Sequence, residues 1–246
     1  MNPRLEIFYT GQKIAMLTAY DYPTARLLDE AGVDAILVGD SLGMVVLGYP
    51  DTTSVTMDDM IRHTSAVARG VARACVIGDL PIHSYDTPEQ AVANARRLIE
   101  AGAHAVKLEG AHVPQIAALT TAGIPVIGHI GMLPQSIREE GGYKIKGKTP
   151  EALQALIEDG LAVEKAGAIG VVVELVKHES MRPITDALRI PTIGIGSGED
   201  CDGQVLVLHD LVGLFPWFTP KFVHPQAAVG AAIREAAAAY AARVHG

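Results

Sequence analysis

Two short apolar runs of this sequence each end in an aspartate. Asp40 ends the run AILVGD and Asp79 ends CVIGD, and each is followed by residues typical of a loop. If both runs are neighbouring strands, the two carboxylates would repel each other, because no basic residue lies near them in the local sequence. A hard divalent cation would remove this repulsion, and oxygen ligands favour Mg²⁺ over zinc. We therefore predict that Asp40 and Asp79 bind Mg²⁺.

A lysine and a glutamate two residues apart form a second candidate pair. Lys107 lies in the apolar run AVKLEG, which also contains Glu109. Side chains two positions apart in a strand point to the same side, so the two groups should lie together. Lys107 could neutralise Glu109, bind a substrate carboxylate or form a Schiff base. A purely structural ion pair is the alternative.

Two further residues are candidates for proton transfer. Glu174 ends the run GVVVE, where burial among valines would raise its pKa toward that of a useful general base. A solvated glutamate at the start of a helix is the alternative. His129, in GHIGMLPQS, is a possible accessory residue, and a buried histidine without a chemical role fits the same pattern. Asp21 directly precedes a predicted helix, which favours a role as its N-cap.

Eight short β-branched runs alternate with longer Ala- and Leu-rich stretches along the chain. The predicted strands are Ile14–Thr18, Ala35–Val38, Ala74–Gly78, Ala105–Leu108, Pro125–Gly128, Gly170–Val173, Thr192–Ile195 and Val205–Leu208. The predicted helices are Tyr22–Ala31, Met57–Arg69, Pro88–Ala101, Val113–Ala122, Pro150–Ala166 and His178–Leu188. This alternation over 246 residues predicts an α/β protein with a single (β/α)8 TIM barrel spanning residues 1–246, since such barrels take ~250 residues.

A barrel of this kind would bring the candidate residues together, because barrel enzymes keep their active sites at the C-terminal ends of the strands. The residues expected there are Asp40, Ser41, Asp79, Lys107, Glu109, His129 and Glu174. The segment GSGEDCDGQ is too short for a full seventh helix, so it forms a tight loop or the eighth strand is misplaced. The Ala-rich stretch Gln226–Arg243 should form a helix that closes the barrel.

The composition limits the classes of partner. A net charge of −8 and an isoelectric point near 5.5 argue against nucleic acid, which needs a basic face, so we expect small-molecule substrates. Cys75 and Cys201 lie far apart and suggest neither a disulfide framework nor a metal site. The first twelve residues lack the apolar run of a leader, and no stretch approaches the ~18 apolar residues of a membrane span. We expect a cytoplasmic protein that does not bind membranes.

Ten stretches of the sequence, in order over nearly the whole chain, form a distinctive set. They are TAYDYPTA (Thr18–Ala25), VGDSLGMVVLGY (Val38–Tyr49), VTMDDMIRHT (Val55–Thr64), GDLP (Gly78–Pro81), AVKLEG (Ala105–Gly110), GHIGMLPQS (Gly128–Ser136), GGYKIKGK (Gly141–Lys148), VVVELV (Val171–Val176), IPTIGIGSG (Ile190–Gly198) and DGQVLVLHDLVGLF (Asp202–Phe215). The second and seventh are much longer than a generic motif. Together the ten stretches resemble the ketopantoate hydroxymethyltransferase family, also called 3-methyl-2-oxobutanoate hydroxymethyltransferases.

The resemblance implies a barrel of the phosphoenolpyruvate/pyruvate-like type and a one-carbon transfer. In this reaction 5,10-methylenetetrahydrofolate donates a hydroxymethyl group to 3-methyl-2-oxobutanoate, giving 2-dehydropantoate and tetrahydrofolate in pantothenate biosynthesis. By resemblance, Glu174 is the catalytic proton acceptor. Asp40, Ser41, Asp79 and Lys107 bind the substrate, and Asp40, Asp79 and Glu109 bind Mg²⁺, Glu109 through water. The resemblance also implies a homo-oligomer, a decamer in this family.

Two other functions are compatible with parts of the pattern. Another Mg²⁺-dependent enzyme that cleaves C–C bonds of 2-oxo acids would be expected to carry a cysteine on a rim loop, and neither Cys75 nor Cys201 is well placed for that. A non-catalytic barrel that only binds metabolites would be expected to lack one of the carboxylates, and all are present.

Overall fold

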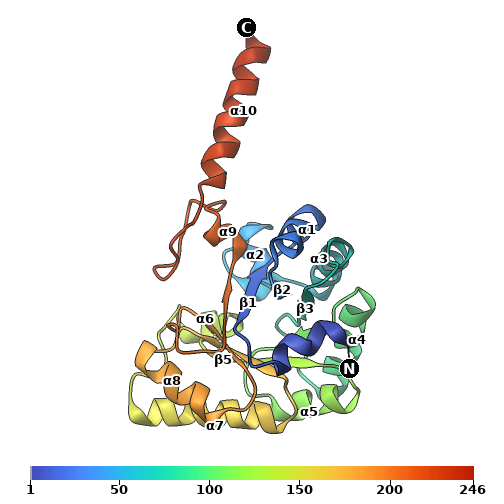
Figure 1. Ribbon diagram of the computed structural model, residues 1–246, viewed down its shortest axis with the longest axis vertical. Helices are drawn as coiled ribbons and strands as arrows, with labels where there is room; N and C mark the ends of the chain where they lie inside the picture. Colours follow the sequence, from blue (N-terminus) through green and yellow to red (C-terminus); the bar gives the residue numbers. More distant parts are fainter. Residues whose placement is uncertain (1) are drawn as a thin grey trace. The chain divides into compact units, whose positions relative to one another are not determined.

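Eight parallel strands form a closed barrel in chain order in the computed structural model, which describes residues 2–246 (Figure 1). The strands are β1 (Ile14–Thr18), β2 (Ala35–Val38), β3 (Cys75–Asp79), β4 (Ala105–Lys107), β5 (Val126–Gly131), β6 (Gly170–Glu174), β7 (Thr192–Ile195) and β8 (Gly203–Leu206). Seven successive pairs, from β1–β2 to β7–β8, have parallel register. The predicted α/β barrel is confirmed.

Helices connect most of the strands, and their ends follow from the local sequence. Helix α1 begins at the N-cap Asp21, whose Oδ1 accepts a hydrogen bond from the backbone nitrogen of Thr24 at 2.8 Å, and ends at Gly32 with a φ of 91°. Asp21 is therefore a cap, as predicted. The α-helices are α1 (Tyr22–Ala31), α2 (Leu42–Val45), α3 (Met57–Gly70), α4 (Pro88–Glu100), α5 (Val113–Thr121), α6 (Ile137–Glu140), α7 (Pro150–Lys165), α8 (His178–Ala187), α9 (Leu208–Leu211) and α10 (Val229–His245), and the short 3₁₀ helices are η1 (Pro3–Tyr9), η2 (Thr52–Ser54) and η3 (Pro134–Ser136).

An apolar layer fills the barrel near the N-terminal ends of the strands. It consists of inward-facing residues from the first half of most strands, such as Ile14, Cys75 and Ile127, together with Leu5 and Phe8 of η1. The sequence pattern did not predict η1. Because apolar side chains occupy this end, the polar side chains of the barrel interior are confined to the C-terminal end.

Five of the eight strands, β3, β4, β5, β6 and β8, have bounds that differ from the predicted ones by one to three residues. Strands β5 and β6 extend to Gly131 and Glu174, which pair in register, so His129 lies within β5 and not in the following loop. Strand β8 begins two residues earlier than predicted, at Gly203. A side chain at Gly203 would overlap the backbone oxygen of Ile14, so glycine permits this close pairing. No helix separates β7 from β8, which confirms the tight loop.

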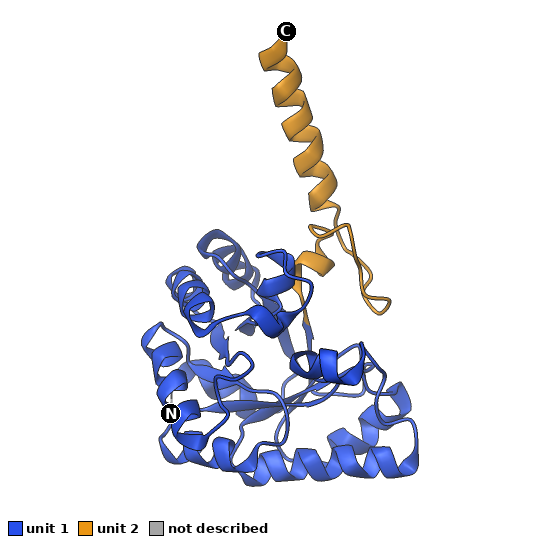
Figure 2. Ribbon diagram, turned by 180° about the vertical axis from the view of Figure 1, so that it is seen from behind, with its two compact units in different colours: residues 1–205 blue, residues 206–246 orange. Residues whose placement is uncertain are grey.

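The chain divides into two compact units, residues 1–205 and residues 206–246, which are coloured separately in Figure 2. The first unit contains the candidate site residues. The predicted C-terminal helix forms as α10, in the second unit. Its role in closing the barrel and the single domain over residues 1–246 stay predictions. Within residues 2–246, every helix is too short or too polar to cross a membrane.

We predict that Gly131→Ala destabilises the protein more than Gly123→Ala. Both glycines have positive φ, 95° and 75°, so alanine strains the backbone at each by roughly 1–2 kcal/mol. A Cβ at position 123 meets open space, whereas at position 131 it would overlap the backbone oxygen of Glu174. Relieving that overlap should cost about 1–3 kcal/mol more. Urea unfolding measures the difference, and equal free energies of unfolding would contradict the close β5–β6 approach.

Candidate active site

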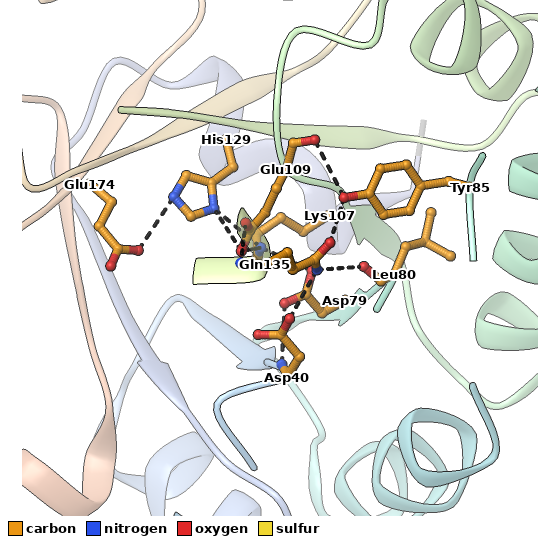
Figure 3. Close-up of polar contacts among 9 residues, drawn as sticks. All are labelled: Asp40, Asp79, Leu80, Tyr85, Lys107, Glu109, His129, Gln135 and Glu174. Carbon is orange, nitrogen blue, oxygen red and sulfur yellow. Dashed lines mark hydrogen bonds and ion pairs between the residues drawn. The ribbon is translucent and has the colours of Figure 1, made fainter. Parts of the chain in front are cut away.

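Six titratable side chains meet at the C-terminal end of the barrel (Figure 3). They come from five successive strands or from the residues just after them: Asp40 after β2, Asp79 at the end of β3, Lys107 and Glu109 at the end of β4 and beyond, His129 in β5 and Glu174 at the end of β6. All are buried except Glu174, whose side chain is 13% exposed. The structure therefore brings together every charged residue of the predicted site.

Lys107 is the one lysine or arginine within this cluster. Its Nζ lies 2.9 Å from Asp79 Oδ1, 3.8 Å from Glu109 Oε1 and 3.3 Å from His129 Nδ1. Burial alone would lower the pKa of Lys107, but Asp79, Glu109 and Asp40 raise it above its usual value. A Schiff base needs an unprotonated amine, so this environment favours an ion-pairing or carboxylate-binding role over covalent chemistry.

Asp40 and Asp79 lie against each other. The backbone nitrogen of Asp40 donates a hydrogen bond to Asp79 Oδ2 at 3.2 Å. Burial, and then the charge of Asp79, raise the pKa of Asp40 to about 7. Burial also raises the pKa of Glu109 well above its usual value, and the charges of Asp40 and Asp79 add to this, whereas Lys107 opposes it. Several buried carboxylates thus share a single ammonium group.

The chemistry of this cluster fits a hard divalent cation. Its donors are carboxylate oxygens in excess of positive charge, which is the set that Mg²⁺ prefers. Asp79 Oδ1 is buried in its ion pair with Lys107, and His129 Nε2 is buried beside Glu174, and neither atom makes a further well-aligned hydrogen bond. However, no group of three or more His, Cys, Asp and Glu side chains within residues 2–246 is already spaced around a metal position. The ligand set Asp40, Asp79 and Glu109 remains a prediction.

Glu174 occupies a different environment from the aspartates. Its Oε2 lies 3.3 Å from His129 Nε2. Burial raises the pKa of Glu174 to about 8, with Lys107 opposing this shift. Burial and the nearby Lys107 lower the pKa of His129, so the imidazole is neutral. Because an ammonium group only donates, His129 Nδ1 accepts from Lys107 and the ring proton is on Nε2, the nitrogen that lies nearer Glu174.

Four uncharged residues of the site escaped the sequence analysis. The hydroxyl of Tyr20 lies 2.8 Å from Ser41 Oγ, which places the predicted substrate-binding serine beside a buried phenol. Tyr143 lies between α6 and α7. Burial is the main cause that raises its pKa, and the nearby charges of Glu174 and Asp40 raise it further. The other two are Tyr85 and Gln135, which contact the acidic residues directly (Figure 3). These four residues lie in segments that follow strands, as the charged residues do. That position was the one feature of the sequence that could have identified them as site residues.

The two cysteines take no part in the cluster. Cys75 is the first residue of β3, at the opposite end of that strand from Asp79, and is fully buried. Burial raises the pKa of its thiol to about 12, which makes it unreactive. Cys201 is also buried, and its Sγ lies 3.0 Å from the backbone oxygen of Gly203. The C–C lyase alternative therefore lacks the expected cysteine at the rim.

The barrel is shared with solved structures of enzymes that act on small acids. A phosphonopyruvate hydrolase in complex with oxalate and Mg²⁺ superposes with a TM-score of 0.66 at 16% identity, covering 84% of this chain and 81% of the other. A 2,3-dimethylmalate lyase, a member of the PEP mutase/isocitrate lyase superfamily, superposes with a TM-score of 0.64 at 18% identity, covering 98% and 87%. At this identity the similarity defines the class of fold only.

Sequence comparison identifies the family within this class. Residues 4–246 match the ketopantoate hydroxymethyltransferase family, and the chain belongs to it. The 3-methyl-2-oxobutanoate hydroxymethyltransferase of Acetivibrio thermocellus is 56% identical over 240 residues, which cover 96% of this chain and 85% of that protein. The enzyme of the same name from Pyrobaculum neutrophilum is 55% identical over 231 residues, covering 93% and 88%. The resemblance found in the sequence motifs is confirmed.

We predict that the metal-free protein loses stability between about pH 6.5 and about pH 8. Unfolded carboxyl groups titrate near pH 4, whereas Asp40, with a pKa of about 7, and Glu174, with a pKa of about 8, keep their protons longer when folded. The unfolded state then binds fewer protons, so the free energy of unfolding falls by up to about 1.4 kcal/mol per pH unit for each group. His129 has the opposite effect, because its pKa is lower in the folded protein than in the unfolded chain. It makes the free energy of unfolding rise with pH, but only below about pH 6.5, where the unfolded histidine is protonated.

Urea unfolding in the presence of a chelator at several pH values measures this slope. Glu174→Gln should make it shallower, because the glutamine cannot titrate. A free energy of unfolding that stays constant or rises over this range would show that the carboxylates are not protonated in the folded protein.

Proposed function

We propose that this protein transfers a hydroxymethyl group from 5,10-methylenetetrahydrofolate to 3-methyl-2-oxobutanoate. One water is consumed, and the products are 2-dehydropantoate and tetrahydrofolate, in the synthesis of pantothenate. Membership of the family supports the reaction class. The observation that carries the proposal is the position of Glu174, a carboxylate with a pKa of about 8 that lies beside a cluster rich in buried acids and containing Lys107.

The cluster divides into groups that would bind the substrate and groups that would hold Mg²⁺. Asp40 and Asp79 would hold the cation directly, and Glu109 through a water. Lys107, with its raised pKa, stays charged and would bind the negative charge of the 2-oxo acid, with Ser41 as a further polar contact. When bound, Mg²⁺ would supply positive charge that favours the enolate form of the substrate.

Glu174 would remove the proton from carbon 3 of the 2-oxo acid. A base is most effective when its pKa lies near the operating pH, and burial places Glu174 in that range. The neutral His129, whose Nε2 lies 3.3 Å from Glu174 Oε2, would leave the negative charge of the carboxylate unpaired and free to accept the proton. The enolate carbon would then form the new bond to the one-carbon unit of the folate.

We also propose that the enzyme acts in the cytoplasm as a homo-oligomer. The absence of a disulfide supports a reducing compartment, since both cysteines are free and buried. The family resemblance supports the decamer. Small molecules are its substrates, and an acidic chain with a net charge of −8 disfavours nucleic acid as a partner.

Exchange of the carbon-3 proton of 3-methyl-2-oxobutanoate in deuterated water tests the base separately from the transfer. We expect the wild type to catalyse this exchange with Mg²⁺ and without folate, as measured by NMR. Glu174→Gln should slow it by roughly 10²–10⁴-fold, because the amide cannot accept the proton. The matched control is Glu179→Gln in α8, where the native side chain is 73% exposed and lies outside the cluster, so exchange should be unchanged.

Exchange that continues at the wild-type rate in Glu174→Gln would reject Glu174 as the base. If the folded wild type shows no exchange, the measurement is repeated with a folate analogue. Exchange that then begins would mean that the folate must be bound before enolisation, whereas continued absence would reject the 2-oxo acid as the substrate.

A further inference from the structure

One uncharged residue, Gln135, joins two of the acidic side chains across the mouth of the barrel (Figure 3). It lies in η3, after β5, and its exposed fraction is only 5%. Its Nε2 donates to Asp40 Oδ2 at 2.9 Å and to the backbone oxygen of Leu80 at 3.0 Å. Its backbone nitrogen donates to Glu109 Oε2 at 3.0 Å. One residue thus donates hydrogen bonds to carboxylates that follow two different strands, β2 and β4.

Tyr85 fixes the orientation of the Gln135 amide. Its hydroxyl donates to Gln135 Oε1 at 2.5 Å. A carboxylate and a backbone carbonyl only accept hydrogen bonds, so the NH₂ group of Gln135 must face Asp40 and Leu80. The Oε1 atom then faces Tyr85, which is protonated at neutral pH and supplies the matching donor. Rotating the amide by a half turn would break three hydrogen bonds at once.

The backbone around Gln135 is held as firmly as its side chain. Pro134 precedes it in η3 and fixes one backbone dihedral angle. Leu80, which accepts from Gln135, is fully buried, and its own nitrogen donates to the backbone oxygen of Lys107 at 2.9 Å. The residue that contacts both acidic side chains is therefore hydrogen-bonded to the backbone just after β3, which is itself hydrogen-bonded to the end of β4.

We propose that Gln135 is a positioning residue that orients Asp40 and Glu109 for a divalent cation, with Tyr85 setting the direction of its amide. The inference rests on the proposed function, because it takes these two carboxylates as cation ligands. One oxygen of each, Asp40 Oδ2 and Glu109 Oε2, is engaged by Gln135. Residues that hold metal ligands in place commonly change metal affinity by about 10–100-fold when they are removed.

Binding of Mn²⁺ to the full-length protein, followed by electron paramagnetic resonance, tests this inference without using activity. Gln135→Met keeps the length of the side chain but removes the amide, so the dissociation constant for Mn²⁺ should rise by about 10–100-fold. Tyr85→Phe removes a single hydroxyl and should weaken binding by a smaller factor. The spectrum of bound Mn²⁺ should change in Gln135→Met, because its ligands are no longer held.

Gln115→Met is the matched control. Gln115 is also buried, and its Nε2 donates at 3.3 Å to the backbone oxygens of Tyr85 and Asp86, so the substitution removes two hydrogen bonds without touching an acidic side chain. The Mn²⁺ affinity of Gln115→Met should stay within about twofold of the wild type. Replacing a residue that hydrogen-bonds to a metal ligand lowers the affinity by about 10-fold or more. Urea unfolding of each variant reports whether it folds.

The outcomes separate this inference from the proposed function. A wild type that binds no Mn²⁺ overturns both. A wild type that binds Mn²⁺, with Gln135→Met binding equally well, overturns the positioning role and leaves the cation site standing. If Gln135→Met does not fold, Tyr85→Phe decides, because wild-type affinity in that variant overturns the inference. An equal loss in Gln115→Met and Gln135→Met also overturns it, since the effect would then be general.

Discussion

The excess of buried carboxylate over positive charge around Lys107 is the constraint on which the rest of this site depends. Asp40, Asp79 and Glu109 are each at most 5% exposed, and Lys107 is the one lysine or arginine within the cluster. Removing such groups from water is costly, and one ammonium group cannot compensate all of them. The site therefore holds protons on some of its acids or takes up a cation. Its chemistry begins from this imbalance.

The barrel makes this concentration of charge possible by separating it from the rest of the interior. Leu5 and Phe8 of η1 and residues from the first half of most strands fill one end with apolar side chains. Parallel strands then deliver successive polar residues to the opposite end, where each backbone is held by its neighbours. Gly131, which pairs with Glu174, shows how close this packing is, because the structure leaves no room there for a Cβ atom.

The sequence predicted the charged residues of the site because a charge at the end of an apolar strand is unusual, and chain order alone placed them at one rim. It did not predict Gln135 or Tyr85. An amide and a phenol in a polar loop are ordinary, and their role depends on contacts across the barrel, since Gln135 is 95 positions from Asp40. Strand ends were missed for a similar reason. His129 is in β5 because β6 continues the ladder beside it, which the flanking glycines concealed.

Under the proposed function, carboxylates of similar intrinsic acidity take different roles because their surroundings differ. Asp40 accepts a hydrogen bond from Gln135, which holds its side chain in place. It also lies against Asp79, whose negative charge raises the pKa of Asp40. Glu174 contacts only the neutral His129 within this cluster, and it is the least buried of the acids. A group that must move a proton needs freedom and a raised pKa, whereas a group that must hold a cation needs fixed oxygens. The hydrogen bonds of the site follow this division, which is why its neutral residues matter as much as its charges.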